Sequence, residues 1–148
     1  MQSKAFSGYP FSLDGHVGVA KFYFALWESN NFERGAKGKI IEAMGQAVKS
    51  LHDYGRRYPI GRPSAYLYQG LYDWAWHRKS KAKQAWHQGL AAAHQLGMRY
   101  EQGRLLYELG RHLPANTPKR REYLLEAQEI FEELEAAYDL ALVRAEKV

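Results

Sequence analysis

The residues of this sequence with the most usable chemistry are its six histidines, which can bind metal ions or transfer protons. His87 and His94 are seven residues apart, so on a helix both point to one side. Two-histidine metal sites on a helix use an i, i+4 spacing, whereas seven residues separate the imidazoles by about 10 Å along the axis. We therefore expect exposed or partly buried histidines and no metal site. His112 follows Arg111 at a predicted helix end, where we expect a cation favoured by the helix dipole.

Other patterns for nucleotide binding or covalent catalysis are incomplete. The segment ERGAKGK, residues 33–39, lacks the spacing and the preceding strand of a phosphate-binding loop. The serines of GYPFS and GRPS are not in a nucleophile elbow, and Glu132 and Glu133 belong to an acidic helix that faces water. The sequence has no cysteine, which excludes disulfides and thiol nucleophiles. We expect neither an enzyme nor a bound cofactor.

The elements that must position these side chains are all predicted to be helices. Residues 1–13 form an irregular lead-in without a sustained hydrophobic period. After it, apolar residues recur at the i, i+3/i+4, i+7 spacing of amphipathic helices. Asp14, Ser80 and Thr117 are interpreted as N-caps, Pro63 as a first-turn proline and Gly97 as a C-terminal stop. The predicted helices cover about residues 15–29, 36–57, 63–77, 80–96, 99–112, 118–134 and 137–146.

The apolar spacing also predicts which side chains are buried. In the first helix Val19, Phe22 and Leu26 form the core face, and Phe24 and Trp27 widen it. We expect this helix to pack against neighbouring helices on more than one side, because its apolar face is wide. Near the end of the chain, the residues expected in the core are Leu124, Ala127, Phe131 and Leu134, followed by Tyr138, Leu142 and Ala141 in a last helix that covers the open end.

A repeated helical hairpin gives the clearest architectural signal. The pairs Gln69-Gly70 and Gln102-Gly103 are 33 residues apart, a period typical of tetratricopeptide-type repeats. Relative to that pattern, the small and aromatic positions of the first copy are filled by Tyr66, Gly70, Ala82, Trp86 and Gly89. We predict an all-α fold in which antiparallel helix pairs stack as a short right-handed solenoid of about seven helices. One domain, residues 14–148, would contain pairs over 14–57, 63–96 and 99–134 and a capping helix over 137–146.

A resemblance to a known family rests on three stretches: YGRRYPIGRPSAYLYQGLYDW (54–74), LAAAHQLGMRYEQGRLLYELGRHL (90–113) and AYDLALVRA (137–145). They resemble the C-terminal tetratricopeptide-like region of large bacterial signalling ATPases, in which a nucleotide cyclase or protein kinase is joined to an AAA-type or STAND ATPase. The resemblance covers about residues 40–145. Its motifs are structural, so it carries over no catalytic residues. It implies a fragment or stand-alone relative of a regulatory region.

Charge is distributed unevenly along the chain. Residues 1–121 contain 19 Lys/Arg against 8 Asp/Glu, a net +11, whereas residues 122–148 contain 2 against 8, a net −6. A basic body can attract nucleic acid or an acidic protein surface. No signal peptide is recognisable, and the apolar run 17–27 carries Lys21 and is far shorter than a membrane span. We expect a cytoplasmic protein without a membrane partner.

Two surfaces are therefore the candidate binding sites. Tyr, Trp and Arg supply most binding hot spots, and they are found on the leading helices of the two repeats. The candidate groove consists of Leu67, Leu71, Trp74, Tyr100, Arg104, Tyr107 and Glu108, and the candidate basic patch consists of Arg78, Lys79, Lys81 and Lys83. We expect a non-catalytic protein-interaction or regulatory module that binds a protein segment, such as its own ATPase or effector domains. The alternative is nucleic-acid binding; a small-molecule pocket and a homo-oligomer also remain open.

Overall fold

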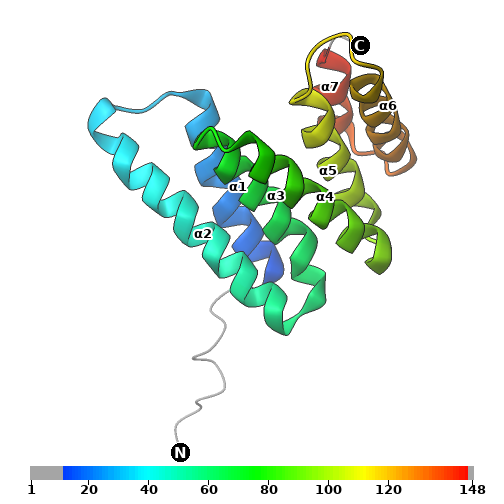
Figure 1. The fold of residues 1–148 in the computed structure, drawn as a ribbon. Helices are drawn as coiled ribbons and strands as arrows, with labels where there is room; N and C mark the ends of the chain where they lie inside the picture. Colours follow the sequence, from blue (N-terminus) through cyan, green and yellow to red (C-terminus); the bar gives the residue numbers. More distant parts are fainter. Residues whose placement is uncertain (1–11, 147–148) are drawn as a thin grey trace, which may run out of the picture.

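The computed structural model describes residues 12–146, and every regular element in this range is a helix (Figure 1). The all-α prediction is confirmed. Residues 1–11 of the expected lead-in, and residues 147 and 148, lie outside the described residues. The α-helices are α1 (Leu13–Ser29), α2 (Lys37–Arg57), α3 (Arg62–Ala75), α4 (Lys79–Leu96), α5 (Arg99–Arg111), α6 (Pro118–Glu133) and α7 (Ala137–Ala145), with 3₁₀ turns η1 (Arg34–Ala36) and η2 (Pro59–Gly61) before α2 and α3.

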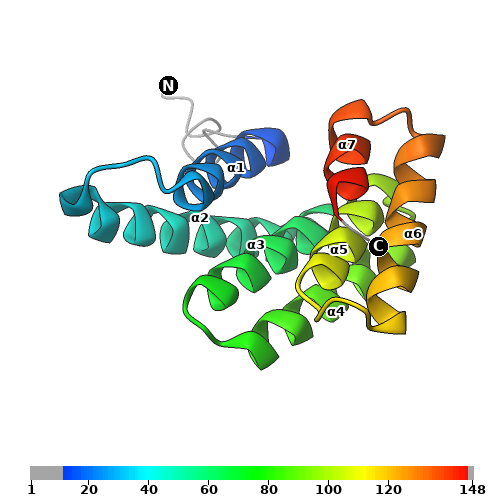
Figure 2. The same cartoon turned by 90° about the horizontal axis from the view of Figure 1, so that it is seen from above.

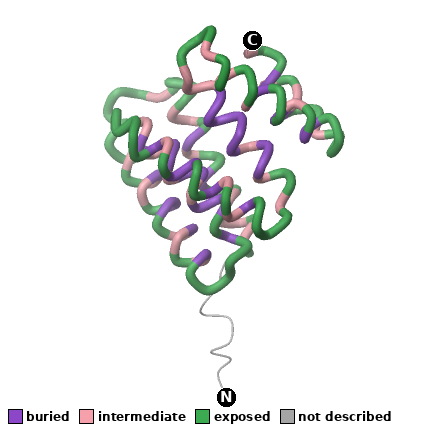
Figure 3. The backbone as a smooth tube through the Cα atoms, turned by 45° about the vertical axis from the view of Figure 1, so that its right-hand side comes forward, coloured by how far each residue is buried: buried purple, intermediate pink, exposed green. Residues whose placement is uncertain are grey.

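Helix packing follows chain order. Each α-helix packs against its neighbours in sequence, and α3 also contacts α1 and α5 (Figures 1 and 2). Figure 3 shows buried residues running along the central helices, with exposed residues on the outer surfaces. Helix α5 serves two hydrophobic clusters: Leu105 and Leu109 belong to the one built with α1–α4, and Leu106 belongs to the one built with α6 and α7. The contacts agree with stacked hairpins, and the right-handed solenoid stays a prediction.

The close packing of α3 against α4 depends on Gly70, which has no side chain. A Cβ on Gly70 would lie 2.1 Å from Nε1 of Trp86, so only glycine lets the indole approach α3 this closely. The buried Trp86 Nε1 donates a hydrogen bond of 3.1 Å to the carbonyl of Leu67. Gly97 then ends α4 in the left-handed conformation at φ 66°, as predicted. Gly70 and Trp86, two of the positions read from the repeat pattern, thus pack against each other.

Several helix starts differ from the sequence prediction. Helix α1 begins at Leu13, one residue inside the expected lead-in, and its N-cap is Ser12 rather than Asp14. Ser80 is not an N-cap, because α4 already begins at Lys79. Thr117 occupies the N-cap position of α6, but its hydroxyl donates to the carbonyl of Pro114 instead of capping the helix. Local hydrogen-bonding alternatives of this kind are what make serine and threonine ambiguous at helix ends.

The buried faces of the outer helices are also rotated from the predicted ones. In α1, Val19 is exposed and Phe22 is 62% exposed, whereas Ala20 and Phe24 are buried. Phe24 points inward because its ring packs against Tyr68 of α3, with 5.3 Å between centroids. The other residues predicted to be buried that lie on the surface are Leu134, Tyr138 and Ala141, whereas Leu142 is partly buried and Val143 takes the core position of α7.

No helix among residues 12–146 combines the length and the apolar character needed to cross a lipid bilayer.

Candidate functional site

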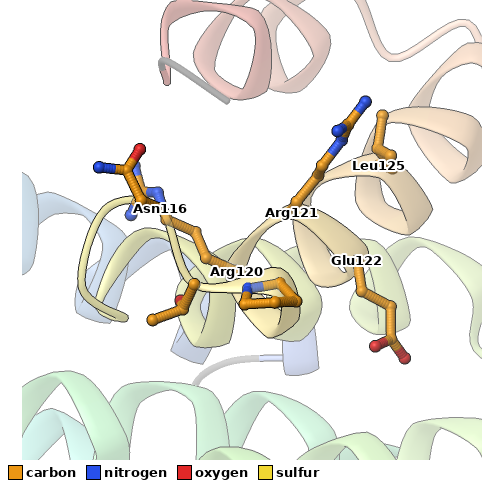
Figure 4. Close-up of a pocket in the computed structure, with 7 residues that line it drawn as sticks. Asn116, Arg120, Arg121, Glu122 and Leu125 are labelled. Atoms are coloured by element: carbon orange, nitrogen blue, oxygen red, sulfur yellow. The ribbon is translucent and has the colours of Figure 1, made fainter.

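One hollow on the described surface lies at the start of α6. It is about 600 Å³ and is lined by residues of the α5–α6 loop and of the first turns of α6. Figure 4 shows Arg121 and Glu122 extending in opposite directions from this turn. Arg120 is engaged: its Nη1 donates to three carbonyls at the end of α5, at 2.9–3.1 Å, and its Nη2 pairs with Glu146 at 2.7 Å. Arg120 therefore holds the end of α5 in place.

A second concavity, which we call the groove, is formed by four helices that are far apart in sequence. It has a volume of about 200 Å³. Figure 2 shows α1 and α7 on the same side of α3 and α5, facing each other, so that α3 and α5 form the floor and α1 and α7 the walls. The lining residues are Lys21, Phe24, Ala25 and Glu28 of α1, Tyr68 and Leu71 of α3, Arg104, Tyr107, Glu108 and Arg111 of α5, and Tyr138, Asp139 and Leu142 of α7.

The structure brings four of the seven predicted groove residues together. These four are Leu71, Arg104, Tyr107 and Glu108. Leu67 is instead buried in the core. Trp74 packs against Trp86 and His112, and Tyr100 lies at the edge of the groove, where its hydroxyl donates to Asp139 at 3.0 Å. Four of the predicted residues thus line one concavity, and their role in binding stays a prediction.

The walls of the groove were missed by the sequence analysis. Lys21 and Glu28 of α1 and Asp139 of α7 line it, and the ammonium of Lys21 lies 5.8 Å from the ring centroid of Tyr138 across it. In α1 the lining residues recur at positions 21, 24, 25 and 28, which is one helical face. That periodicity is visible in the sequence, but it mixes charged and apolar residues, so a search for apolar faces passes over it.

The α1 side of the groove is closed by a charge-paired triad. Arg111 Nη2 lies 2.7 Å from Glu28 Oε1 and Arg111 Nε lies 2.6 Å from Glu108 Oε2. Burial raises the pKa of the Glu108 carboxyl, an effect that the charge of Arg111 opposes. The two carboxylates share one guanidinium, so each of them already has a cationic partner.

The α7 side is less completely paired. Nε of Arg104 lies 3.9 Å from Oδ1 of Asp139, and among residues 12–146 no other carboxylate oxygen comes within 4.0 Å of this guanidinium. The Arg104 side chain is only 17% exposed. Tyr68, at the floor beside it, is buried, and its hydroxyl has no hydrogen-bond partner among the described residues. Burial raises the pKa of Tyr68, and the nearby charge of Arg104 acts in the opposite direction.

His112 lies partly buried at the end of α5, with 12% of its side chain exposed, and its surroundings disfavour the cation that the helix dipole was expected to favour. Its centroid lies 4.3 Å from the ring of Trp74 and 4.8 Å from that of Trp86. Burial and the charge of Arg111 lower the pKa of His112 to about 4. Nδ1 lies 2.8 Å from the backbone carbonyl of Glu108, so this nitrogen carries the proton. Tertiary burial therefore overrides the helix dipole here.

Among the described residues, those of the predicted basic patch and the histidines do not line the groove. In the basic patch, Arg78 pairs with the buried Asp73 at 2.8 Å, and the ammonium of Lys79 lies 5.4 Å from the ring centroid of Trp74. Arg78 and Lys79 thus have intramolecular partners. The remaining two cations of the patch are Lys81 and Lys83. Among residues 12–146 no cluster of three histidine, aspartate or glutamate side chains has the arrangement needed to hold a metal ion.

Comparisons with models of known protein families, with curated proteins and with solved structures gave no match to this chain. The resemblance to the helical regions of bacterial signalling ATPases therefore stays a prediction.

Proposed function

We propose that this chain is a non-catalytic interaction module that binds a segment of another protein in the groove between α1, α3, α5 and α7. The observation that carries the proposal is the composition of the groove. Three tyrosines and two arginines converge there from three different helices, next to apolar Phe24 and Leu71. Tyrosine and arginine offer large rigid contact areas and directed donors, which is why they dominate binding hot spots.

The size of the groove supports a protein segment over a free small molecule. Pockets for drug-sized ligands usually enclose about 300–1,000 Å³, whereas this one is about 200 Å³ and open to solvent. Such a space accepts one or two side chains of a longer chain that continues beyond the groove. Following the family resemblance, we propose that the module has a regulatory role in a cytoplasmic bacterial signalling protein and that its partner can be an ATPase or effector domain.

The test is a selection of random 12-residue peptides displayed on phage against the purified chain. Selected peptides are then synthesised, and their Kd is measured by fluorescence polarisation. Tyr138→Ala should weaken binding by about tenfold, because a tyrosine at the centre of an interface commonly contributes 1–2 kcal/mol or more. Tyr138 is 69% exposed, so its replacement leaves the core intact.

The matched control is Phe22→Ala, which removes an exposed aromatic ring of α1 that does not line the groove. We expect this variant to bind selected peptides as the unaltered chain does. The proposal is wrong if selection returns no peptides, or if the two variants bind the peptides equally well.

A further inference from the structure

We propose that the groove recognises a carboxylate of its partner segment, held between the guanidinium of Arg104 and the hydroxyl of Tyr68. This inference rests on the proposed function and names the chemistry of the partner: an acidic peptide that places one Asp or Glu side chain on the groove floor.

The first support is the unfilled donor capacity of Arg104. A guanidinium has five N–H donors in a planar fork that fits the two oxygens of a carboxylate. Among the described residues, the carboxylate within 4.0 Å of the guanidinium is that of Asp139, whose Oδ1 lies 3.9 Å from Nε, too far for a hydrogen bond. The carboxylate of Glu108 also acts on the charge of Arg104. The oxygen Oδ2 of Asp139 already accepts from the Tyr100 hydroxyl at 3.0 Å. No carboxylate of residues 12–146 therefore makes a hydrogen bond to this largely buried guanidinium, which leaves it able to pair with an incoming anion.

The second support is the orphaned hydroxyl of Tyr68. A buried polar atom without a partner costs free energy and is rare in native structures, so each case needs an explanation. Tyr68 lines the groove, where burial raises the pKa of its hydroxyl and the charge and hydrogen-bonding influence of the neighbouring Arg104 lower it. An incoming carboxylate would satisfy both groups at once, because the hydroxyl donates to one oxygen while the guanidinium pairs with the other.

A cationic ligand group fits the groove less well. The three groove carboxylates already have partners: Glu28 and Glu108 pair with Arg111 at 2.7 and 2.6 Å, and Asp139 accepts from the Tyr100 hydroxyl at 3.0 Å. Lys21 adds a further positive charge at the α1 rim. The flanking surfaces of Phe24, Leu71 and Leu142 are apolar, so the favoured segment has an aliphatic side chain next to its acidic residue.

The test uses peptides selected from the phage library on the unaltered chain. We expect one acidic position to be shared among those whose binding Tyr138→Ala weakens. Replacing that residue by its amide should raise the Kd at least about tenfold, the value of one charge-assisted hydrogen bond. In Arg104→Gln the acidic and amide peptides should bind about equally. Arg144→Met is the control, since Arg144 pairs with Glu132 outside the groove and the acid preference should be unchanged.

Tyr68→Phe keeps the experiment decisive if Arg104→Gln does not fold. The lost hydroxyl has no partner in the described chain, so the urea midpoint should stay the same or rise. The Kd for the acidic peptide should rise several-fold and that for the amide peptide should not change. An affinity for acidic peptides that is unaffected in both variants would overturn the inference.

The outcomes separate this inference from the proposed function. Groove-dependent peptides without a shared acidic position would refute the carboxylate site and leave the interaction module standing. A complete absence of groove-dependent peptides would refute both. A dimer, seen by analytical ultracentrifugation and abolished by Arg104→Gln, would identify the acidic surface of a second copy as the occupant and would refute the assignment to a partner peptide.

Discussion

His112 should make the stability of this protein depend on pH in the mildly acid range. The ring stacks on Trp86 and packs at a tilt against Trp74, and its Nδ1 is fixed by the carbonyl of Glu108. Burial, followed by the charge of Arg111, lowers its pKa to about 4, whereas an unfolded histidine titrates near 6.5. The folded protein therefore binds this proton less readily than the unfolded chain does. The stabilising contribution is complete above about pH 6.5 and is lost as the pH falls towards 4.

The size of the effect follows from linkage between protonation and unfolding. With pKa values of about 4 folded and 6.5 unfolded, the free energy of unfolding should fall by about 1.3 kcal/mol between pH 7.5 and 5.5, and by about 2.5 kcal/mol at pH 4.5. Glu108 acts in the opposite direction, because burial raises its pKa and protonation then favours the folded state as the pH falls. A non-titrating variant is therefore needed to isolate the histidine.

The assay is urea unfolding followed by far-UV circular dichroism at pH 7.5, 5.5 and 4.5, on the unaltered chain and on His112→Asn. Asparagine can donate to the same carbonyl but does not titrate. The difference between the two unfolding free energies should shrink by about 2.5 kcal/mol from pH 7.5 to 4.5. Parallel loss of stability in the two proteins would refute a neutral, buried ring.

Three further changes test the packing and the groove. Gly70→Ala places a Cβ 2.1 Å from an indole nitrogen and should lower the free energy of unfolding by about 2 kcal/mol or more, whereas Gly18→Ala meets open space on a helix and should raise it by up to about 1 kcal/mol, both measured in urea. Arg120→Lys cannot serve three carbonyls and a carboxylate at once and should cost about 2 kcal/mol in urea unfolding, against a negligible change for Arg121→Lys. Asp139→Asn removes the carboxylate that lies 3.9 Å from Arg104, so acidic peptides should bind more tightly, as measured by their Kd in fluorescence polarisation.

The central hairpin was predictable because its signals are local. The structural roles of four residues in it depend only on backbone conformation or on a partner less than 20 residues away in sequence. These residues are Pro63, Gly70, Trp86 and Gly97. When a glycine faces a large aromatic side chain across a short turn, the two residues alone predict that the helices pack closely at that point. The repeat spacing then extended the same interpretation to α5, whose floor residues Arg104 and Tyr107 were found in this way.

The orientation of α1 and α7 could not be predicted, because it depends on contacts with residues far along the chain. Ranking by hydrophobicity puts Tyr138 inside and Asp139 outside, and the structure does the reverse. Asp139 turns inward because Tyr100 and Arg104, 39 and 35 residues earlier, offer it a hydrogen bond and an ion pair. A wide apolar face, as in α1, likewise leaves the rotation of a helix open until its neighbours are known.

The position of α5 explains why the charged groups of the groove are where they are. Its aliphatic residues enter hydrophobic clusters on two sides, which leaves the stripe of Arg104, Glu108 and Arg111 as the remaining face. Charges on a helix this deeply packed need partners, since an unpaired buried charge is costly. Arg111 has two carboxylates on the α1 side, but Arg104 has one at 3.9 Å on the α7 side. Both carboxylates at the α1 end are within hydrogen-bond distance of Arg111, whereas Arg104 has no carboxylate of the described residues at that distance, so an acidic segment should enter with its carboxylate towards α7.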